Sequence, residues 1–205
     1  MARPPVGSVT PMMQQYLAIK EQHPDELLFY RLGDFYEMFF DDALTASREL
    51  ELTLTGRDCG LPERAPMCGV PYHAVDTYIT RLIEKGYRVA ICEQMEDPAL
   101  AKGLVKREIT RIVTPGTVTD QSALSERQNN FLASVCMEGK RAGLAYTDVT
   151  TGEFYVRQLS NEERELRGAL AAIAPREIIT NAPDTVHPLS EASIGSCPQT
   201  AFRGA

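Results

Sequence analysis

The sequence changes its pattern at Pro115-Gly116, a dipeptide that interrupts both helices and strands. Before this break, stretches with helical periodicity alternate with short apolar runs. Helices are expected over residues 10–24, 35–52 and 72–85, and strands over 27–32, 87–94 and 106–114. Residues 53–68, rich in glycine and proline, are expected to form turns. The alternation predicts a mixed α/β domain with helices packed on a sheet.

After the break the pattern favours strands. Three predicted strands at 130–137, 142–149 and 153–159 are joined by tight turns, which is typical of an antiparallel meander. A helix over 162–174, capped by Asn161, and one strand at 178–180 follow. This order resembles the start of a ribonuclease-H-like fold. Such a domain needs more strands and helices than these, so we expect the chain to be part of a longer protein.

The residues between the two patterns, 117–130, are polar and lack periodicity. They predict an exposed, hinge-like interdomain linker. We therefore expect one domain at 1–116, a linker at 117–127, and a second, incomplete domain at 128–205.

The composition is that of an ordinary soluble protein, with 43% hydrophobic and 24% charged residues. No apolar run approaches the roughly 20 residues of a membrane span, and no signal peptide is visible, so we expect a cytoplasmic protein without a membrane partner. The five cysteines form no CxxC pair and the three histidines lie far apart in sequence. We therefore predict neither a metal site nor a catalytic constellation.

The net charge of −7 argues against a simple basic-surface nucleic-acid binder. Residues 101–111 are the exception, because they hold four basic side chains against Glu108 alone. Within this segment, Lys102 and Arg107 are candidate phosphate contacts. The alternative is an ordinary solvated strand or loop face.

The stretch Gly33-Asp34-Phe35-Tyr36-Glu37 allows two interpretations. Asp34 and Glu37 have the spacing of a helix capping box, which would make Phe35 a peripheral core residue beside a helical apolar stripe. Alternatively, the backbone is still extended here, and Phe35 and Glu37 then point the same way. An aromatic ring and a carboxylate on one face could wedge into stacked bases and hydrogen-bond to one of them.

Asp148, on the second strand of the meander, is a lone acid without visible carboxylate partners. We interpret it as structural, because a metal-dependent nuclease would need clustered carboxylates. A protein-interaction module without DNA contact is a further alternative, which the acidic charge favours.

Four ordered blocks resemble the MutS family of DNA mismatch-repair proteins. They are Gly33-Asp34-Phe35-Tyr36-Glu37, Met67-Cys68-Gly69-Val70-Pro71-Tyr72-His73-Ala74, Val89-Ala90-Ile91-Cys92-Glu93-Gln94 and Arg111-Ile112-Val113-Thr114-Pro115-Gly116-Thr117. The resemblance implies a mismatch-binding domain followed by a truncated ribonuclease-H-like connector domain. It also implies recognition of mismatched double-stranded DNA, with Phe35 as the stacking ring and Glu37 as the base-contacting carboxylate.

Further expectations rest on this resemblance alone. Arg57 falls where the family often has a basic residue near the DNA backbone. The connector implies a partnership with MutL, and the full-length protein is expected to form a homodimer and to be a DNA-dependent ATPase that uses ATP and Mg²⁺. The sequence contains no GxxxxGK[ST] phosphate loop, so no cofactor and no enzymatic activity are expected of these 205 residues.

Overall fold

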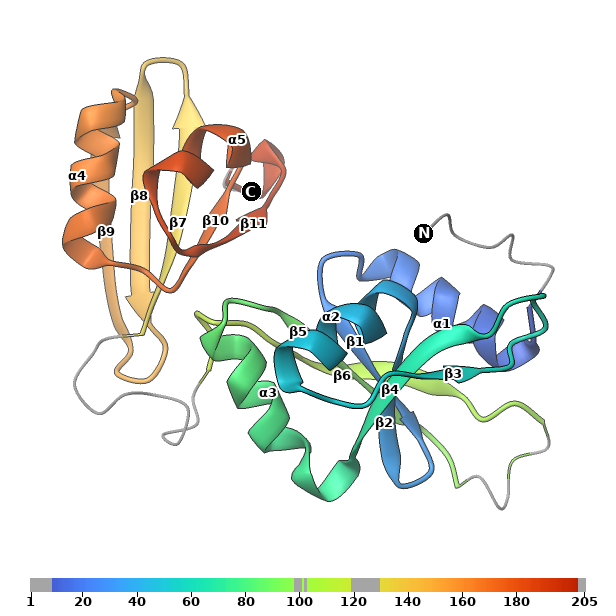
Figure 1. Ribbon diagram of the computed structural model, residues 1–205. Coiled ribbons are helices and arrows are strands. Elements are labelled where there is room, and N and C mark those ends of the chain that lie inside the picture. The colour runs from blue at the N-terminus through green and yellow to red at the C-terminus, as the bar shows by residue number, and fades with distance from the viewer. Residues whose placement is uncertain (1–8, 98–100, 102, 119–129, 203–205) are drawn as a thin grey trace. The chain divides into compact units, whose positions relative to one another are not determined.

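In the computed structural model, residues 9–97, 101, 103–118 and 130–202 are described, and the chain divides into two compact units, Met1–Val113 and Thr114–Ala205. Figure 1 shows that each unit has a sheet and helices of its own.

The first unit is built on a six-stranded mixed sheet with the order β3-β4-β2-β1-β5-β6. Its strands are β1 (Leu27–Leu32), β2 (Phe35–Phe39), β3 (Thr55–Arg57), β4 (Ala65–Pro71), β5 (Val89–Gln94) and β6 (Arg107–Val113). Strands β1 and β5 are parallel, and the other neighbours are antiparallel. The helices are α1 (Pro11–Gln22), α2 (Phe40–Leu50) and α3 (Val75–Glu84), with the 3-10 turn η2 (Tyr72–Ala74) before α3.

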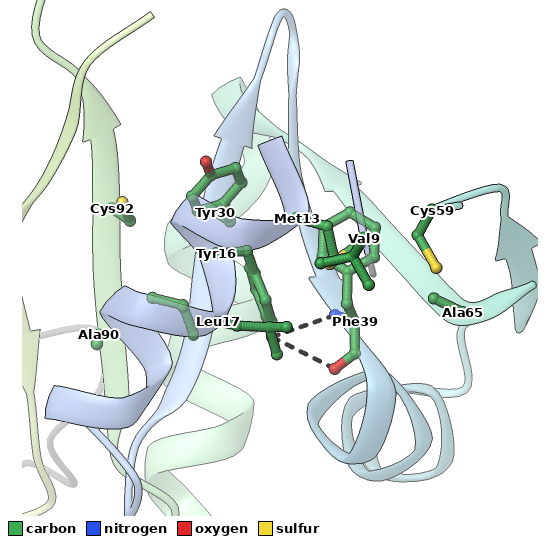
Figure 2. Close-up of a cluster of buried hydrophobic side chains, with 11 residues drawn as sticks. Val9, Met13, Tyr16, Leu17, Tyr30, Phe39, Cys59, Ala65, Ala90 and Cys92 are labelled. Atoms are coloured by element: carbon green, nitrogen blue, oxygen red, sulfur yellow. Dashed lines mark hydrogen bonds between the residues drawn. The ribbon is translucent and has the colours of Figure 1, made fainter. Parts of the chain in front are cut away.

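Helix α1 covers one face of this sheet. The Tyr16 ring meets the rings of Tyr30 and Phe39 edge-on, with centroids 5.4 and 5.0 Å apart. Figure 2 shows this cluster, in which all three rings are almost fully buried. Helix α2 lies on the opposite face, where Cys68 Sγ donates to the Ala43 carbonyl oxygen. The sheet is therefore the middle of three layers.

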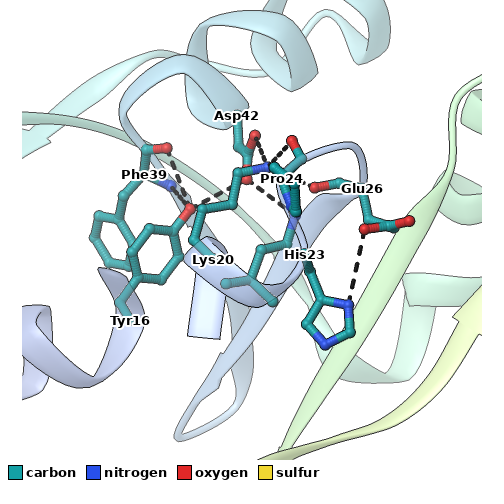
Figure 3. Close-up of polar contacts among 8 residues, drawn as sticks. Tyr16, Lys20, His23, Pro24, Glu26, Phe39 and Asp42 are labelled. Atoms are coloured by element: carbon teal, nitrogen blue, oxygen red, sulfur yellow. Dashed lines mark hydrogen bonds and ion pairs between the residues drawn. The ribbon is translucent and has the colours of Figure 1, made fainter. Parts of the chain in front are cut away.

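A buried carboxylate ties α1, β1 and α2 together (Figure 3). Asp42 is 6% exposed, and its Oδ2 accepts from the Leu28 N–H at 3.0 Å and from the Tyr16 hydroxyl at 3.3 Å. Lys20 Nζ lies 3.0 Å from its other oxygen. Burial raises the pKa of Asp42, and Lys20 acts against that rise. These bonds fix α1 against the strand that precedes the Gly33 turn.

The predicted helix over 35–52 is wrong at its start. Residues Phe35–Phe39 form strand β2, and the helix begins only at Phe40. Asp34 is not a helix cap, because it lies in the turn between β1 and β2, and its carbonyl oxygen accepts from the Tyr72 N–H. The 53–68 stretch also contains strands, β3 and the start of β4, in addition to the expected turns. The other elements predicted for this unit are present.

The second unit has a five-stranded sheet with the order β11-β10-β7-β8-β9. The expected meander is confirmed as β7 (Phe131–Glu138), β8 (Arg141–Asp148) and β9 (Glu153–Ser160). Helix α4 (Glu163–Ile173), β10 (Glu177–Thr180), α5 (Pro183–Val186), η3 (His187–Leu189), β11 (Ser193–Ser196) and η4 (Gln199–Phe202) follow. Strand β10 is parallel to both β7 and β11. Two strands thus follow the helix, where one was expected.

The core of this second unit lies between α4 and one face of the sheet, and includes Leu144, Leu166, Leu170 and Ile178. Asn161 does not cap α4, because the helix begins after Glu162. Its side chain instead donates to the Gly139 carbonyl oxygen, in the turn between β7 and β8. Asp148 is 2% exposed, and its carboxylate accepts from the Asn130 and Thr150 N–H groups and from the Thr150 hydroxyl. These contacts give Asp148 the structural role that we expected.

Most of the predicted linker, residues 119–127, lies outside the described residues. At the described ends Thr117 is exposed as expected, but the expected exposure is wrong for Val118 and Asn130. Val118 is 7% exposed and Asn130 is 5% exposed, and the Asn130 side-chain amide donates to the Val118 carbonyl oxygen. The Gly116 N–H donates to Glu177 Oε2 at 3.0 Å. Residues 114–118 therefore pack with the second unit.

Candidate nucleic-acid interface

The tip of the β1–β2 hairpin presents an exposed aromatic ring. Residues Leu32 and Phe35 pair across a two-residue turn, in which Gly33 has φ +58°. This conformation is the one that a hairpin turn with glycine in its first position requires. Phe35 is 47% exposed, although it is hydrogen-bonded into the sheet between β1 and β4, opposite Pro71. A strand end that is paired on both sides therefore holds an aromatic side chain out toward solvent.

Glu37 lies two residues along the same strand. Because alternate residues of a strand share a face, Phe35, Glu37 and Phe39 point to the same side of the sheet. Phe39 packs beneath Tyr16 of α1, whereas Phe35 at the strand end stays exposed. The extended-backbone interpretation of this motif is therefore the one that the structure adopts.

The Glu37 carboxylate is paired with an arginine. Arg57 Nη1, on β3, lies 2.6 Å from Glu37 Oε2, and the two side chains are 38% and 18% exposed. The strand between them, β4, carries Gly69 opposite Glu37. A Cβ at Gly69 would lie 3.2 Å from the Tyr36 carbonyl oxygen and 3.4 Å from Glu37 Cγ. Glycine therefore keeps space around the Glu37 side chain.

The opposite face of the hairpin is held by an arginine and two tyrosines. The Arg31 guanidinium lies 4.0 Å from the centroid of Tyr72 and 5.4 Å from that of Tyr36. The Tyr36 hydroxyl donates to Glu93 of β5. Burial, together with this carboxylate, raises the pKa of Tyr36 to about 12, so the phenol remains a donor at neutral pH. Sequence reasoning missed these supports, because their role depends on strand register.

The basic segment contributes less than we expected. Lys102 lies outside the described residues. Arg107 is 7% exposed, and its guanidinium donates to the Arg31 and Val105 carbonyl oxygens and to the Gln15 side chain. Arg107 therefore stabilises β1 through these internal contacts. The exposed cations Lys106 and Arg111 are also near carboxylates, 2.6 Å from Glu108 and 3.6 Å from Asp76.

The described residues contain no group of three or more His, Cys, Asp or Glu side chains placed to hold a metal ion. In the same residues, no helix combines the length and the apolar character that crossing a membrane requires.

Comparison with known proteins accounts for both units. The family model described as MutS domain I matches residues 10–122. This chain belongs to the MutS family. The model of MutS domain II matches residues 130–191, so the second unit corresponds to the connector domain and the first to the mismatch-binding domain. The predicted fold class, two mixed α/β units of the MutS type, is confirmed.

Individual MutS relatives are similar over most of the chain. It is 64% identical over 178 residues to the DNA mismatch repair protein MutS of Ruminiclostridium cellulolyticum, covering 86% of this chain and 20% of that protein. The corresponding protein of Acetivibrio thermocellus is 61% identical over 178 residues, which again cover 86% of this chain and 20% of that protein. That of Desulforamulus reducens is 52% identical over 198 residues, 95% of this chain and 23% of the relative. The chain thus spans about a fifth of the length of these relatives.

Proposed function

We propose that this chain recognises mismatched or unpaired bases in duplex DNA and so initiates mismatch repair. In this proposal Phe35 is an aromatic wedge and Glu37 is a base-contacting carboxylate. The observation that carries it is that both side chains lie on one face of an extended strand, with Phe35 47% exposed at the strand end. The similarity to proteins named DNA mismatch repair protein MutS supports it.

The physical basis is the cost of deforming DNA. A wedge that enters from the minor groove unstacks a base step at a cost of about a few kcal/mol and kinks the duplex. A mispaired step has already lost part of its stacking and pairing, so the same deformation costs less there. Phe35 would therefore select for deformability, largely independently of which bases form the mispair.

Glu37 adds hydrogen bonding to a base to this selection by deformability. Its carboxylate can accept a hydrogen bond from a base N–H, or donate one when protonated. A negative charge close to phosphates disfavours any duplex, and only a mispair that hydrogen-bonds to Glu37 recovers this cost. The carboxylate thus disfavours ordinary duplex more than a mispair.

The whole protein's other activities would lie outside this sequence. The 205 residues contain no phosphate loop, so we infer that ATP and Mg²⁺ bind elsewhere in the full-length protein and that this chain alone hydrolyses no ATP. Homodimerisation is likewise proposed for the full-length protein only. We also keep the cytoplasm as the proposed location.

An interaction role is favoured for the second unit by one observation. Phe154 and Val156, which alternate on edge strand β9, are 65% and 67% exposed. We propose MutL as the partner, which the family membership suggests. A module that binds proteins without touching DNA is the alternative for the whole chain.

The test is to change Phe154 and Val156 to aspartate in the full-length protein. Its complex with MutL, measured by sedimentation velocity, should weaken, and its binding to mismatched DNA should stay intact. An unchanged complex with MutL would reject this surface.

The proposal for Phe35 is tested by replacing it with alanine in the full-length protein. Base–aromatic stacking is worth about 1–3 kcal/mol, so we expect discrimination between mismatched and matched duplex to fall by about 5- to 150-fold. Fluorescence anisotropy gives both affinities, and circular dichroism checks folding. Leu44→Ala, which removes another exposed side chain of this unit on helix α2, is the matched control. Retained discrimination in folded Phe35→Ala would reject the wedge.

A further inference from the structure

The Glu37 carboxylate, which is proposed to contact the base, already accepts a hydrogen bond within the chain. Arg57 Nη1 lies 2.6 Å from Glu37 Oε2 in the DNA-free chain. Among the residues that the structure describes, Arg57 is the one hydrogen-bond partner of this carboxylate. A base can therefore hydrogen-bond to Glu37 Oε2 only if this oxygen accepts from both groups or releases Arg57.

The pair is built so that it can exchange. Both side chains reach past β4 to meet, Glu37 from β2 and Arg57 from the short strand β3. Arg57 is 38% exposed and Glu37 is 18% exposed, so solvent and salt reach the arginine side of the pair. Ion pairs with this exposure are weak and separate readily. The guanidinium has five N–H donors, so it can bind a phosphate oxygen with donors that Glu37 does not use.

We propose that Arg57 is a positioning residue that holds the Glu37 carboxylate toward the DNA-facing side, and that it transfers to a DNA phosphate when a mispaired base engages Glu37. This inference rests on the proposed function of Glu37. Before DNA binds, Arg57 fixes the rotamer of the carboxylate and offsets only part of its negative charge, because the pair is partly exposed to solvent. At a mispair, the base hydrogen bond replaces Arg57, which then contacts the backbone. In matched duplex no base reaches Glu37, and Arg57 remains on the carboxylate.

Two properties distinguish this exchange from a simple phosphate contact. A simple contact would strengthen binding to matched and mismatched duplex alike. The exchange couples Arg57 to Glu37, so it affects the ratio of the two affinities. It also adds a phosphate contact at the mispair alone, and one such contact steepens the salt dependence, log K against log salt, by about 0.9 for B-form DNA.

The test is a double-mutant cycle in the full-length protein, with Arg57→Ala, Glu37→Ala and the double variant. We expect Arg57→Ala to lower mismatch discrimination by about 3- to 10-fold and the salt slope for mismatched duplex by about 0.9. In the Glu37→Ala background, Arg57→Ala should lower discrimination no further. Arg64→Ala removes another exposed arginine from the β3–β4 connection and should leave both quantities unchanged.

Each contrary outcome has a distinct meaning. Equal weakening of both duplexes by Arg57→Ala would make Arg57 a plain phosphate contact and overturn the exchange. Additive losses in the cycle, or no effect of Arg57→Ala in protein that is folded by circular dichroism, would overturn it as well. Unchanged discrimination in folded Glu37→Ala would instead reject the base-contacting role of Glu37, on which this inference rests. Arg57→Lys, which keeps the charge but loses the planar donors, should fall between the wild type and Arg57→Ala.

Discussion

At the scale of single residues, strand register determines which side chains lie together at the candidate site. Residue types and spacing left open whether Phe35 and Glu37 belong to a helix cap or to an exposed pair, and the resemblance indicated both residues and Arg57. The 2.6 Å contact between Arg57 and Glu37 was not predictable, because it depends on β3 and β4, in a segment that was expected to form turns. Arg107 shows the converse. Its position in a basic segment suggested DNA, but its guanidinium is used to hold β1.

Asp148 permits a prediction about acid stability. Burial by itself raises the pKa of this carboxyl, but hydrogen bonds from Thr150 and the Asn130 N–H outweigh it and lower the pKa below the ordinary 3.8. The carboxylate therefore stabilises the fold above pH 3.8, and this contribution is lost as the pH falls through the lowered pKa. We expect Asp148→Asn to reduce the free energy of unfolding at pH 7 by about 1–3 kcal/mol.

Urea unfolding at several pH values measures this effect. The difference between the wild type and Asp148→Asn should be constant near neutral pH and shrink under acid conditions. Asp184→Asn, at an exposed site in the same unit, is the control, with an expected change within about 0.5 kcal/mol. A difference that grows on acidification would mean that the pKa of Asp148 is not lowered.

At the scale of elements, the hairpin shows where local pattern misleads. The spacing of Asp34 and Glu37 imitates a capping box, and Tyr36, Phe39, Ala43 and Leu50 imitate one helical stripe. The chain forms a strand over Phe35–Phe39 because β1 and β4 pair with it on both sides and satisfy its backbone groups. A short stretch of sequence does not show pairing with a strand that lies far away along the chain. The meander was predictable because its strands follow one another and are joined by short turns.

Gly69 tests how closely β4 must approach the hairpin. A Cβ there would lie 3.2 Å from the Tyr36 carbonyl oxygen, which belongs to paired backbone and has little room to move. We expect Gly69→Ala to lower the free energy of unfolding of the first unit by about 1–3 kcal/mol. Gly143→Ala is the control on β8, because its Cβ would meet nothing closer than 4.0 Å. Equal effects of the two changes in denaturant unfolding would show that β4 adapts easily.

At the scale of the whole molecule, each unit has a hydrophobic core of its own, which suggests two cooperative units. A core cluster lies between α1 and the sheet in the first unit, and another lies between α4 and the sheet in the second. The sequence indicated this division through the change of pattern at Pro115-Gly116. It missed that residues 114–118 pack with the second unit, because the Gly116 contact to Glu177 spans 61 positions. The domain limits 1–116 and 128–205 remain a prediction.

The two units should unfold in separable transitions. We expect Gly69→Ala to shift only the transition of the first unit and Asp148→Asn only that of the second, because each residue lies within one core-bearing unit. Hydrogen exchange of the 205-residue chain, followed by mass spectrometry, assigns each transition to its residues. A single transition that both variants shift equally would show that the chain unfolds as one unit.

The central claim is that Phe35 enters the base stack at a mispair. The most direct measurement is the fluorescence of 2-aminopurine placed beside a mismatch and titrated with the full-length protein, because this emission responds to unstacking. The wild type should change the emission at the mismatch and leave it unchanged in the matched duplex. Phe35→Ala, at concentrations where anisotropy shows that it is bound, should give no change. The same emission change with bound Phe35→Ala would contradict the wedge role of Phe35.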